Sequence, residues 1–324
     1  MKLRLVVLLW GICLVTITGG AARGETYPSR TVRIIVPAAA GSALDVNARK
    51  VAAKLSQTLG QEVIVDNRPG ANGIIGTDLA AKAKPDGYTL LMGSTSTLTI
   101  NPSLYPSLPY RPLDDFAPIT LAVRGSPIML VNASLPVKTL AEFINLAKAK
   151  PGQMNYGSPG TGSIQHLAGK LLERNAGIEM VHVPYKNQSE LLGDLLSGRI
   201  EAMIEFGAVA VPLIKAGKLR ALAIAGPARK PDLPEVPTAA QAGTRGFEVI
   251  GWAGYVAPAG TPPEIIEKLN REITVAILAA DYSGWVTSLG SEVVGGKSQA
   301  FAQTIRADLA TWDALIKEAG VHLE

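Results

Sequence analysis

The feature that most constrains this chain is a regular alternation between short apolar runs and segments with helical periodicity. Residues 33–36, 62–65 and 88–92 are brief and nearly continuous in apolar side chains, which is typical of buried strands. Between the first two runs, apolar residues recur at helical spacing over 44–59, and a glycine ends the segment. Strand, helix and strand in this order predict right-handed βαβ units on a parallel sheet.

A second set of alternating elements follows residue 126. Thr139 and Glu142 form a capping box, which predicts a helix that ends before Pro151. The same patterns predict further strands and helices in this set, namely strands at 154–156, 179–183, 200–206 and 219–225 and helices at about 163–176, 189–197 and 208–216. These elements are enough for a second α/β unit.

The C-terminal part contains too little strand for a domain of its own. An extended run covers 247–257, and the pair Pro262-Pro263 opens a long helix with proline at its first position. A second helical stripe begins near Phe301, and only one short strand candidate, 292–294, lies between the two helices. We therefore expect these helices to dock back on the first unit.

The predicted fold class is therefore α/β with two lobes, each built on a mostly parallel sheet flanked by helices. Lobe 1 is expected to comprise residues 27–125 plus 252–324, and lobe 2 residues 126–251. The chain would cross between the lobes near residues 125 and 251, so that these crossings act as a hinge beside a cleft.

The N-terminus has the layout of a secretory signal peptide. A short basic stretch at residues 1–4 precedes an apolar run from 5 to 17 and small residues up to Gly24. The run is shorter than the roughly 20 apolar residues of a membrane-spanning helix. We expect residues 1–24 to be removed near Ala22 to Gly24, and the protein to be exported to the periplasm.

Removal of the leader changes what the net charge implies. The whole chain has 31 basic and 27 acidic residues, but the leader takes three basic residues with it, which leaves 28 − 27 = +1. No stretch rich in lysine or arginine remains, so the composition argues against nucleic acid as a partner. The single cysteine, Cys13, also lies in the leader, so the exported chain is expected to have no disulfide and no thiolate metal site.

Two loops combine the features expected of an anion site. Residues 37–42 follow the first strand, and Ser42 is a natural N-cap with Asp45 three residues further on. Residues 157–163 lie between a strand and the helix that carries His166. Small residues let backbone N–H groups approach a ligand, and a helix start attracts negative charge. Because neither loop contains lysine or arginine, the pair predicts a clamp of neutral amides and hydroxyls that suits a carboxylate.

Other candidate residues have two interpretations each. Asp45 is either a ligand contact or only a helix cap, and His166 is either a pocket wall or a structural group. Glu205 ends an expected strand, where it could accept from a ligand amine or hydroxyl or simply be a solvated acid at the sheet edge. His182 is expected to be structural, and Trp252 is expected to pack at the hinge.

The sequence offers little for catalysis. Neither loop has the three spaced glycines of a dinucleotide site or the lysine of a P-loop. No serine has glycines two residues away on each side, so the nucleophile elbow is missing. The histidines at 166, 182 and 322 have no clustered carboxylates, so neither a metal site nor a cofactor is expected.

With these features in place, the chain resembles the Bug-type receptors of tripartite tricarboxylate transporters, from Tyr27 essentially to its end. The resemblance rests on ordered motifs spread along the chain: Tyr27-Pro28-Ser29-Arg30, Asp66-Asn67-Arg68-Pro69-Gly70-Ala71, Pro85-Asp86-Gly87-Tyr88-Thr89-Leu90, Leu104-Tyr105 with Leu108-Pro109-Tyr110, Asn155-Tyr156-Gly157-Ser158, His166-Leu167, His182-Val183-Pro184-Tyr185-Lys186, Gly217-Lys218-Leu219-Arg220-Ala221-Leu222-Ala223, Pro234-Glu235-Val236-Pro237-Thr238 and Ala257-Pro258-Ala259-Gly260-Thr261-Pro262.

The resemblance implies a solute receptor with a two-lobed, type II-like periplasmic-binding fold. In this family the two loops hold a ligand carboxylate through backbone groups and bridging water. The ligand-binding residues expected here, with Glu205 added from its own position, are Ala39, Ala40, Gly41, Ser42, Asp45, Ser94, Thr95, Ser158, Gly160, Thr161, Gly162, Ser163, His166 and Glu205. The implied partners are a small carboxylate and the membrane components of a tripartite tricarboxylate transporter, and the receptor is expected to be a monomer.

The chain departs from the family pattern where specificity would be set. Ala38, Ala40 and Ser42 stand in place of an aromatic residue, a proline and a second glycine, and Leu44 fills a position that is usually small. Outside the first loop, Asn187 replaces a glycine, Glu190 a proline and Glu205 an aspartate. Loss of the aromatic residue would widen the pocket, whereas Leu44 would narrow it.

Two other functional classes remain open at this point. A signalling adaptor would dock its closed form on a membrane sensor kinase instead of a transporter. An exported hydrolase would turn its ligand over, but the chain offers no nucleophile for that reaction.

Overall fold

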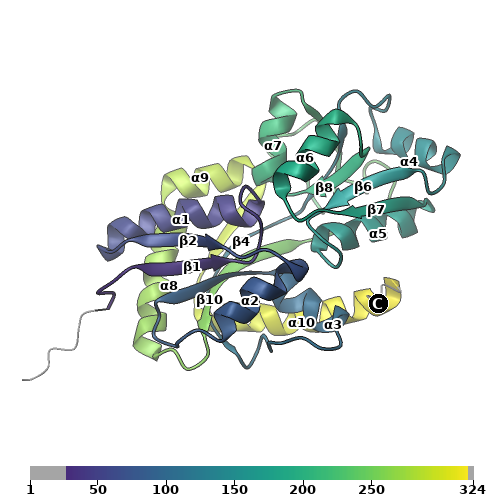
Figure 1. Ribbon diagram of the computed structural model, residues 1–324. Coiled ribbons are helices and arrows are strands. Elements are labelled where there is room, and N and C mark those ends of the chain that lie inside the picture. Colours follow the sequence, from purple (N-terminus) through teal and green to yellow (C-terminus); the bar gives the residue numbers. More distant parts are fainter. Residues whose placement is uncertain (1–26, 320–324) are drawn as a thin grey trace, which may run out of the picture.

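The computed structural model describes residues 27–319, so the expected leader at residues 1–24 lies outside the described residues. The chain folds into one six-stranded and one five-stranded sheet, each flanked by helices (Figure 1). The two-lobed α/β fold predicted from the sequence is confirmed. Among residues 27–319, no helix is long and apolar enough to cross a membrane.

The first sheet has the strand order β11-β4-β10-β3-β1-β2. Its strands are β1 (Val32–Val36), β2 (Val63–Asn67), β3 (Thr89–Ser94), β4 (Phe116–Gly125), β10 (Gly251–Pro258) and β11 (Ser291–Gly295). β1 pairs in parallel with β2 and β3, whereas β10 runs antiparallel to β3 and β4. Residues far apart in sequence therefore build one sheet.

Helices cover both faces of the first sheet. α1 (Ala43–Leu59), α8 (Pro263–Leu278) and α9 (Ala280–Ser288) pack on one face. α2 (Ile74–Ala81) and the start of α10 (Ser298–Ala319) pack on the other. A π-helical turn at Ser96–Ile100 and the short helix α3 (Asn101–Leu104) follow β3.

The second sheet has the order β7-β6-β8-β5-β9. Its strands are β5 (Ile128–Asn132), β6 (Met154–Ser158), β7 (Met180–Pro184), β8 (Ala202–Glu205) and β9 (Leu219–Ile224). Its helices are α4 (Leu140–Ala149) and α5 (Ile164–Ala176) on one face and α6 (Gln188–Ser197) and α7 (Gly207–Lys215) on the other. In β5, Met129 and Val131 enter the first of these cores, whereas Ile128 and Leu130 enter the second.

The expectation of mostly parallel sheets is only partly met, because both sheets are mixed. β5 is antiparallel to β8 and β9, and β10 is antiparallel to both of its neighbours. A strand buried on both faces is a continuous apolar run in either direction, so its pattern does not reveal its polarity. The chain re-enters the first sheet beside the carboxyl end of β3, where Ala253 pairs with Ser94, so β10 runs opposite to β1 and β3.

The two sheets are linked at more places than the sequence indicated. β4, which ends at Gly125, and β10, which begins at Gly251, belong to the first sheet, whereas the strands between them in the chain belong to the second. In addition, Trp312 and Ile316, near the end of α10, pack into the core of the second sheet, and the end of α10 lies near α5 (Figure 1). The long apolar stripe of α10 gave no sign that it serves two different cores.

At Gly76, α2 packs closely against the backbone of Arg68 and Pro37. A Cβ there would lie 2.6 Å from the carbonyl oxygen of Arg68 and 3.0 Å from Cα of Pro37. We expect Gly76→Ala to lower the free energy of unfolding by about 1–3 kcal/mol, because backbone atoms have to move.

The matched control is Gly193→Ala in α6, where the added Cβ meets nothing within 4 Å. This control is expected to be neutral or to stabilise by about 0.5–1 kcal/mol, since alanine is the better helix former. Urea unfolding of both variants checks the prediction. Equal stability of the two variants would contradict the close packing of α2 beneath the first loop.

Candidate functional site

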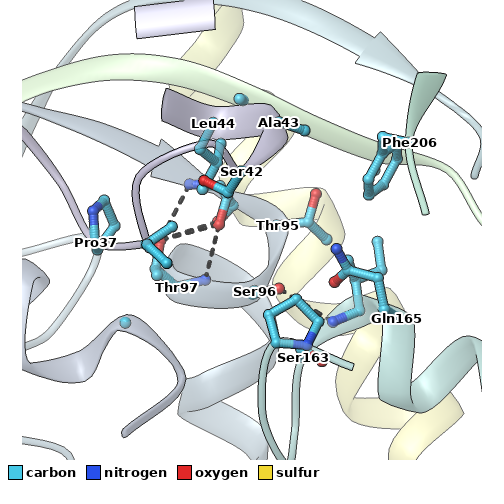
Figure 2. Close-up of a pocket in the computed structure, with 18 of the residues that line it drawn as sticks. Pro37, Ser42, Ala43, Leu44, Thr95, Ser96, Thr97, Ser163, Gln165 and Phe206 are labelled. Atoms are coloured by element: carbon cyan, nitrogen blue, oxygen red, sulfur yellow. Dashed lines mark hydrogen bonds between the residues drawn. The ribbon is translucent and has the colours of Figure 1, made fainter. Parts of the chain in front are cut away.

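Four strands direct their carboxyl ends towards one cavity. β1 and β3 are parallel neighbours in the first sheet, and β6 and β8 are parallel neighbours in the second. Parallel strands end at the same edge, and the loops that follow gather there. A cavity of about 420 Å³ is lined by the segments after all four strands. Figure 2 shows the start of α1 on one side and Ser163, Gln165 and Phe206 on the other.

The first loop ends in a reciprocal helix cap. Ser42 is the N-cap of α1, and its Oγ accepts from the backbone N–H of Asp45 at 3.3 Å. In return, Oδ2 of Asp45 accepts from the N–H of Gly41 at 2.9 Å. Gly41 has φ +79°, a conformation that glycine adopts without strain. The loop is therefore fixed by its own side chains.

The second loop repeats this arrangement in the other lobe. Ser163 is the N-cap of α5, and its Oγ accepts from the N–H of His166 at 3.2 Å. Nδ1 of His166 accepts from the N–H of Gly162 at 3.1 Å. Gly162 has φ +83°, close to the value at Gly41. The sequences Gly-Ser-x-x-Asp and Gly-Ser-x-x-His thus form the same cap, one in each lobe.

The caps explain why two of the candidate residues lie outside the cavity lining. Asp45 also pairs with Arg49 at 2.9 Å, and hydrogen bonds from Arg49 and Gly41 outweigh burial, so the pKa of its carboxyl lies below the usual value. Burial, followed by the charge of Lys170, lowers the pKa of His166 to about 4. The first cap is therefore anionic and the second neutral at physiological pH.

The structure brings part of the expected set to the cavity wall. The members that line it are Ala39, Ser42, Ser94, Thr95, Gly160, Thr161, Ser163 and Glu205. The members that do not line it are Ala40, Gly41, Asp45, Ser158, Gly162 and His166. Gly41, Asp45, Gly162 and His166 hold the loops through the caps, and Ser158 does so through bonds within the loop. Ala40 is exposed and takes part in neither cap.

Two helix starts supply the donors that remain for a ligand. The first N–H groups of a helix have no carbonyl partner within it. Ala43 and Leu44, which line the cavity in the first turn of α1, have N–H groups without an acceptor in the described part of the chain (Figure 2). In the second lobe the N–H of Ile164 is taken by Oγ of Ser96 at 3.1 Å, which leaves that of Gln165. The hydroxyl hydrogens of Ser42 and Ser163 can also be donated to a ligand.

The lobes touch each other around the cavity. Besides Ser96, which caps a helix of the other lobe, the hydroxyl of Tyr105 donates to the carbonyl oxygen of Thr161 at 3.4 Å. At another contact between the lobes, Nζ of the buried Lys230 donates to the carbonyl oxygen of Gly290 at 2.8 Å. The cavity is therefore enclosed by both lobes rather than open on one of them.

A cluster of aromatic rings supports the second loop. The rings of His166 and His182 have centroids 4.0 Å apart, and Tyr156 packs against both. Nε2 of His182 lies 2.7 Å from Oγ of Ser158, at the start of the loop. Burial, with the charges of His166 and Lys170 as smaller causes, lowers the pKa of His182 to about 3. His182 is thus structural, as expected.

Several lining residues were not anticipated from the sequence. Ser96 and Thr97 continue the hydroxyl run that begins at Ser94-Thr95, and that run was the available signal. Besides Leu44, which the departures from the family pattern had already placed at the pocket, the apolar wall includes Phe206, Trp252, Trp285 and Leu289. Nothing in a sequence distinguishes such side chains from ordinary core. Trp252 is tied to Thr95, whose Oγ1 accepts from its backbone N–H at 2.9 Å.

Within residues 27–319, no group of three or more histidine, cysteine, aspartate or glutamate side chains is placed to hold a metal ion. The cavity instead combines hydrogen-bond donors at two helix starts with apolar walls and three charged side chains, Arg124, Lys186 and Glu205. A mostly apolar pocket with a few polar groups is typical of a binding site for a small organic solute.

Comparison with known proteins identifies the family of the chain. A model of the tripartite tricarboxylate transporter family receptors matches residues 47–321. The periplasmic binding protein BugD is 32% identical, with 92% of this chain and 100% of that chain covered and a TM-score of 0.88. Rpa4515 of R. palustris, solved with adipate, is 35% identical, with 91% and 99% covered and a TM-score of 0.88. MatC of Rhodopseudomonas palustris, with bound malate, is 33% identical, with 90% and 100% covered and a TM-score of 0.85.

Fold and site together define a two-lobed solute-binding protein. The chain belongs to the tripartite tricarboxylate transporter family of receptors, and the Bug-type resemblance is confirmed.

His166 and His182 make stability depend on pH. Both have pKa values far below the ordinary 6.5, so the unfolded chain binds protons that the folded chain does not. The free energy of unfolding should therefore fall as the pH drops from 6.5 towards 4. We expect His182→Gln, whose amide can still bond to Ser158, to reduce the loss between pH 7 and pH 5 by about 1–2 kcal/mol.

Urea unfolding of the wild type and of His182→Gln at both pH values measures this difference, and NMR titration of the imidazole signals checks the cause. An unchanged pH dependence in the variant, or an imidazole pKa near 6.5, would show that His182 titrates freely.

Proposed function

We propose that the protein is a periplasmic receptor that captures a small carboxylate between its lobes and delivers it to the membrane components of a tripartite tricarboxylate transporter. In this proposal residues 27–125 plus 252–324 form one lobe and residues 126–251 the other. The receptor acts as a monomer, after removal of residues 1–24, and carries out no reaction on its ligand.

The observation that carries the proposal is the pair of matching caps at opposite walls of one cavity. Each cap ends a small-residue loop at a helix start, where free N–H groups and the helix dipole favour an anion. Asp45 and His166 satisfy the glycine N–H groups behind the loops, so the outward donors stay in position. An anion that touches both loops stabilises the closed arrangement of the lobes.

Known ligands of relatives support the same class of solute. Rpa4515 was solved with adipate and MatC with malate, and both are carboxylates. This chain differs from the family pattern at Leu44, which lines the cavity beside the free N–H groups of α1. We infer that the carboxylate end of the ligand follows the family, whereas the shape of its remaining part does not.

A comparison of acids with their amides tests the requirement for negative charge. The probes are a panel of carboxylates that includes adipate and malate, each paired with the corresponding uncharged amide. We expect the acids to change the fluorescence of Trp252 and Trp285, which line the cavity, and to reduce the radius of gyration in X-ray scattering. The amides should do neither at the same concentration. Equal responses to acid and amide would contradict the anion clamp.

A double-mutant cycle tests whether both loops hold the same ligand. We expect Ser42→Ala and Ser163→Ala each to weaken carboxylate binding by about ten-fold, since each removes a hydroxyl donor and a helix cap. If one anion bridges both loops, the losses of binding free energy in the two single variants should not add. An anion that has lost its contact with one loop is also no longer held in place against the other.

The matched control is Ser197→Ala at the exposed end of α6, which removes a hydroxyl outside the cavity lining and should leave affinity unchanged. Calorimetric titration gives the affinities, and thermal unfolding separates loss of binding from loss of fold. An effect of Ser42→Ala without any effect of Ser163→Ala, or the reverse, would mean that one lobe alone holds the ligand.

A further inference from the structure

Glu205 places a buried carboxylate in the wall of the ligand cavity. It is the last residue of β8, its exposed fraction is 1%, and it lines the cavity next to Phe206. The cost of burying a carboxylate is relieved in one of two ways: a counter-ion pairs with it, or it binds a proton.

The protein supplies Glu205 with neutral partners only. Oε1 accepts from the backbone N–H of Phe206 at 2.7 Å and from Nε2 of Gln165 at 3.4 Å. Oε2 accepts from Nε2 of Gln188 at 3.3 Å. Among residues 27–319, no lysine, arginine or histidine side chain forms an ion pair with this carboxylate, and its pKa is raised by burial.

Other carboxylates near the cavity do have a cation of their own. Asp45 pairs with Arg49 at 2.9 Å. Arg124, which lines the cavity, is held by Glu292 through two bonds of 2.7 and 3.2 Å. Glu205 therefore stands out as a buried acid in the cavity wall whose counter-charge does not come from the protein.

We propose that Glu205 is a specificity-determining residue that pairs with a protonated nitrogen of the ligand, so that the preferred solute is an amino carboxylate. The proposal rests on the proposed function, because it takes the carboxylate end of the ligand to be held by the two capped loops. The ammonium group supplies the charge that Glu205 lacks, and the carboxylate supplies the charge that the helix starts attract.

The position of Gln165 fits this assignment. Its backbone N–H lies in the first turn of α5, where the carboxylate is held, and its side-chain amide reaches Glu205. One glutamine side chain thus spans the interval between the two ligand contacts, and a short amino carboxylate spans the same interval. A dicarboxylate would bring a second anion next to Glu205 and would have to carry a proton into the site.

Matched pairs that differ only in the amine test the proposal. The probes are glutamate against glutarate and phenylalanine against 3-phenylpropanoate, titrated by calorimetry at pH 7.5. We expect the wild type to bind the amine-bearing member of at least one pair about ten- to a hundred-fold more tightly, the range expected for a hydrogen bond to a buried charge. Glu205→Gln should abolish this preference by weakening only the amine-bearing member.

The control is Glu179→Gln, just before β7, which makes the same change of charge at an exposed position outside the lining of the ligand cavity and should keep the preference. Thermal unfolding checks that each variant is folded. Equal affinity within both pairs for the wild type, or a preference that survives in Glu205→Gln, would overturn the role of Glu205. The role would also be overturned if the wild type took up one proton on binding the amine-free acids and Glu205→Gln did not.

These outcomes separate the two proposals. If the amine-free acids bind and close the lobes as tightly as their partners, the assignment of Glu205 fails and the carboxylate receptor stands. If no member of either pair binds, and adipate and malate do not bind either, both proposals fail.

Discussion

The site depends on one local interaction, which occurs twice. A side chain in the first turn of a helix accepts a hydrogen bond from a glycine that precedes the N-cap serine: Asp45 to Gly41 in one lobe and His166 to Gly162 in the other. This bond holds the glycine in its left-handed conformation and turns the first free N–H groups of the helix towards the cavity. Without it, each loop would have to be ordered by the ligand, and the ordering entropy would lower the affinity.

The two caps differ in charge but not in shape. Asp45 is anionic and balanced by Arg49, whereas His166 is neutral because its burial against Tyr156 and His182 disfavours the imidazolium. Neither presents a charge to the cavity, whereas Glu205 is a buried acid in the cavity wall and is placed to attract a cationic group of the ligand. The loops can thus define the class of the solute, while Glu205, beside the second loop, defines which member is preferred.

Much of this could be predicted from residues that act locally. Ser42, Ser163, Thr139 and the glycines after α1 and α5 have side chains or conformations that determine helix ends, so the elements that begin and end there were predicted closely. The small residues between a strand and a helix start, in turn, led to the two loops, and parts of both line the cavity.

The rest depends on contacts between distant parts of the chain. The polarity of β10, the packing of the end of α10 against the second sheet and the burial of Glu205 are set by which segments meet in space. The sequence around Glu205 is equally compatible with an exposed acid at a sheet edge. The sequence also left two roles open for Asp45 and His166, because a cap and a ligand contact require the same residue types at the same helix position.

The most direct test is a crystal structure of the protein with a bound carboxylate. The account predicts one carboxylate group within hydrogen-bond distance of the first turn of α1 and of the first turn of α5 at the same time. A solute bound outside this cavity, or a carboxylate that contacts only one of the two helix starts, would contradict it.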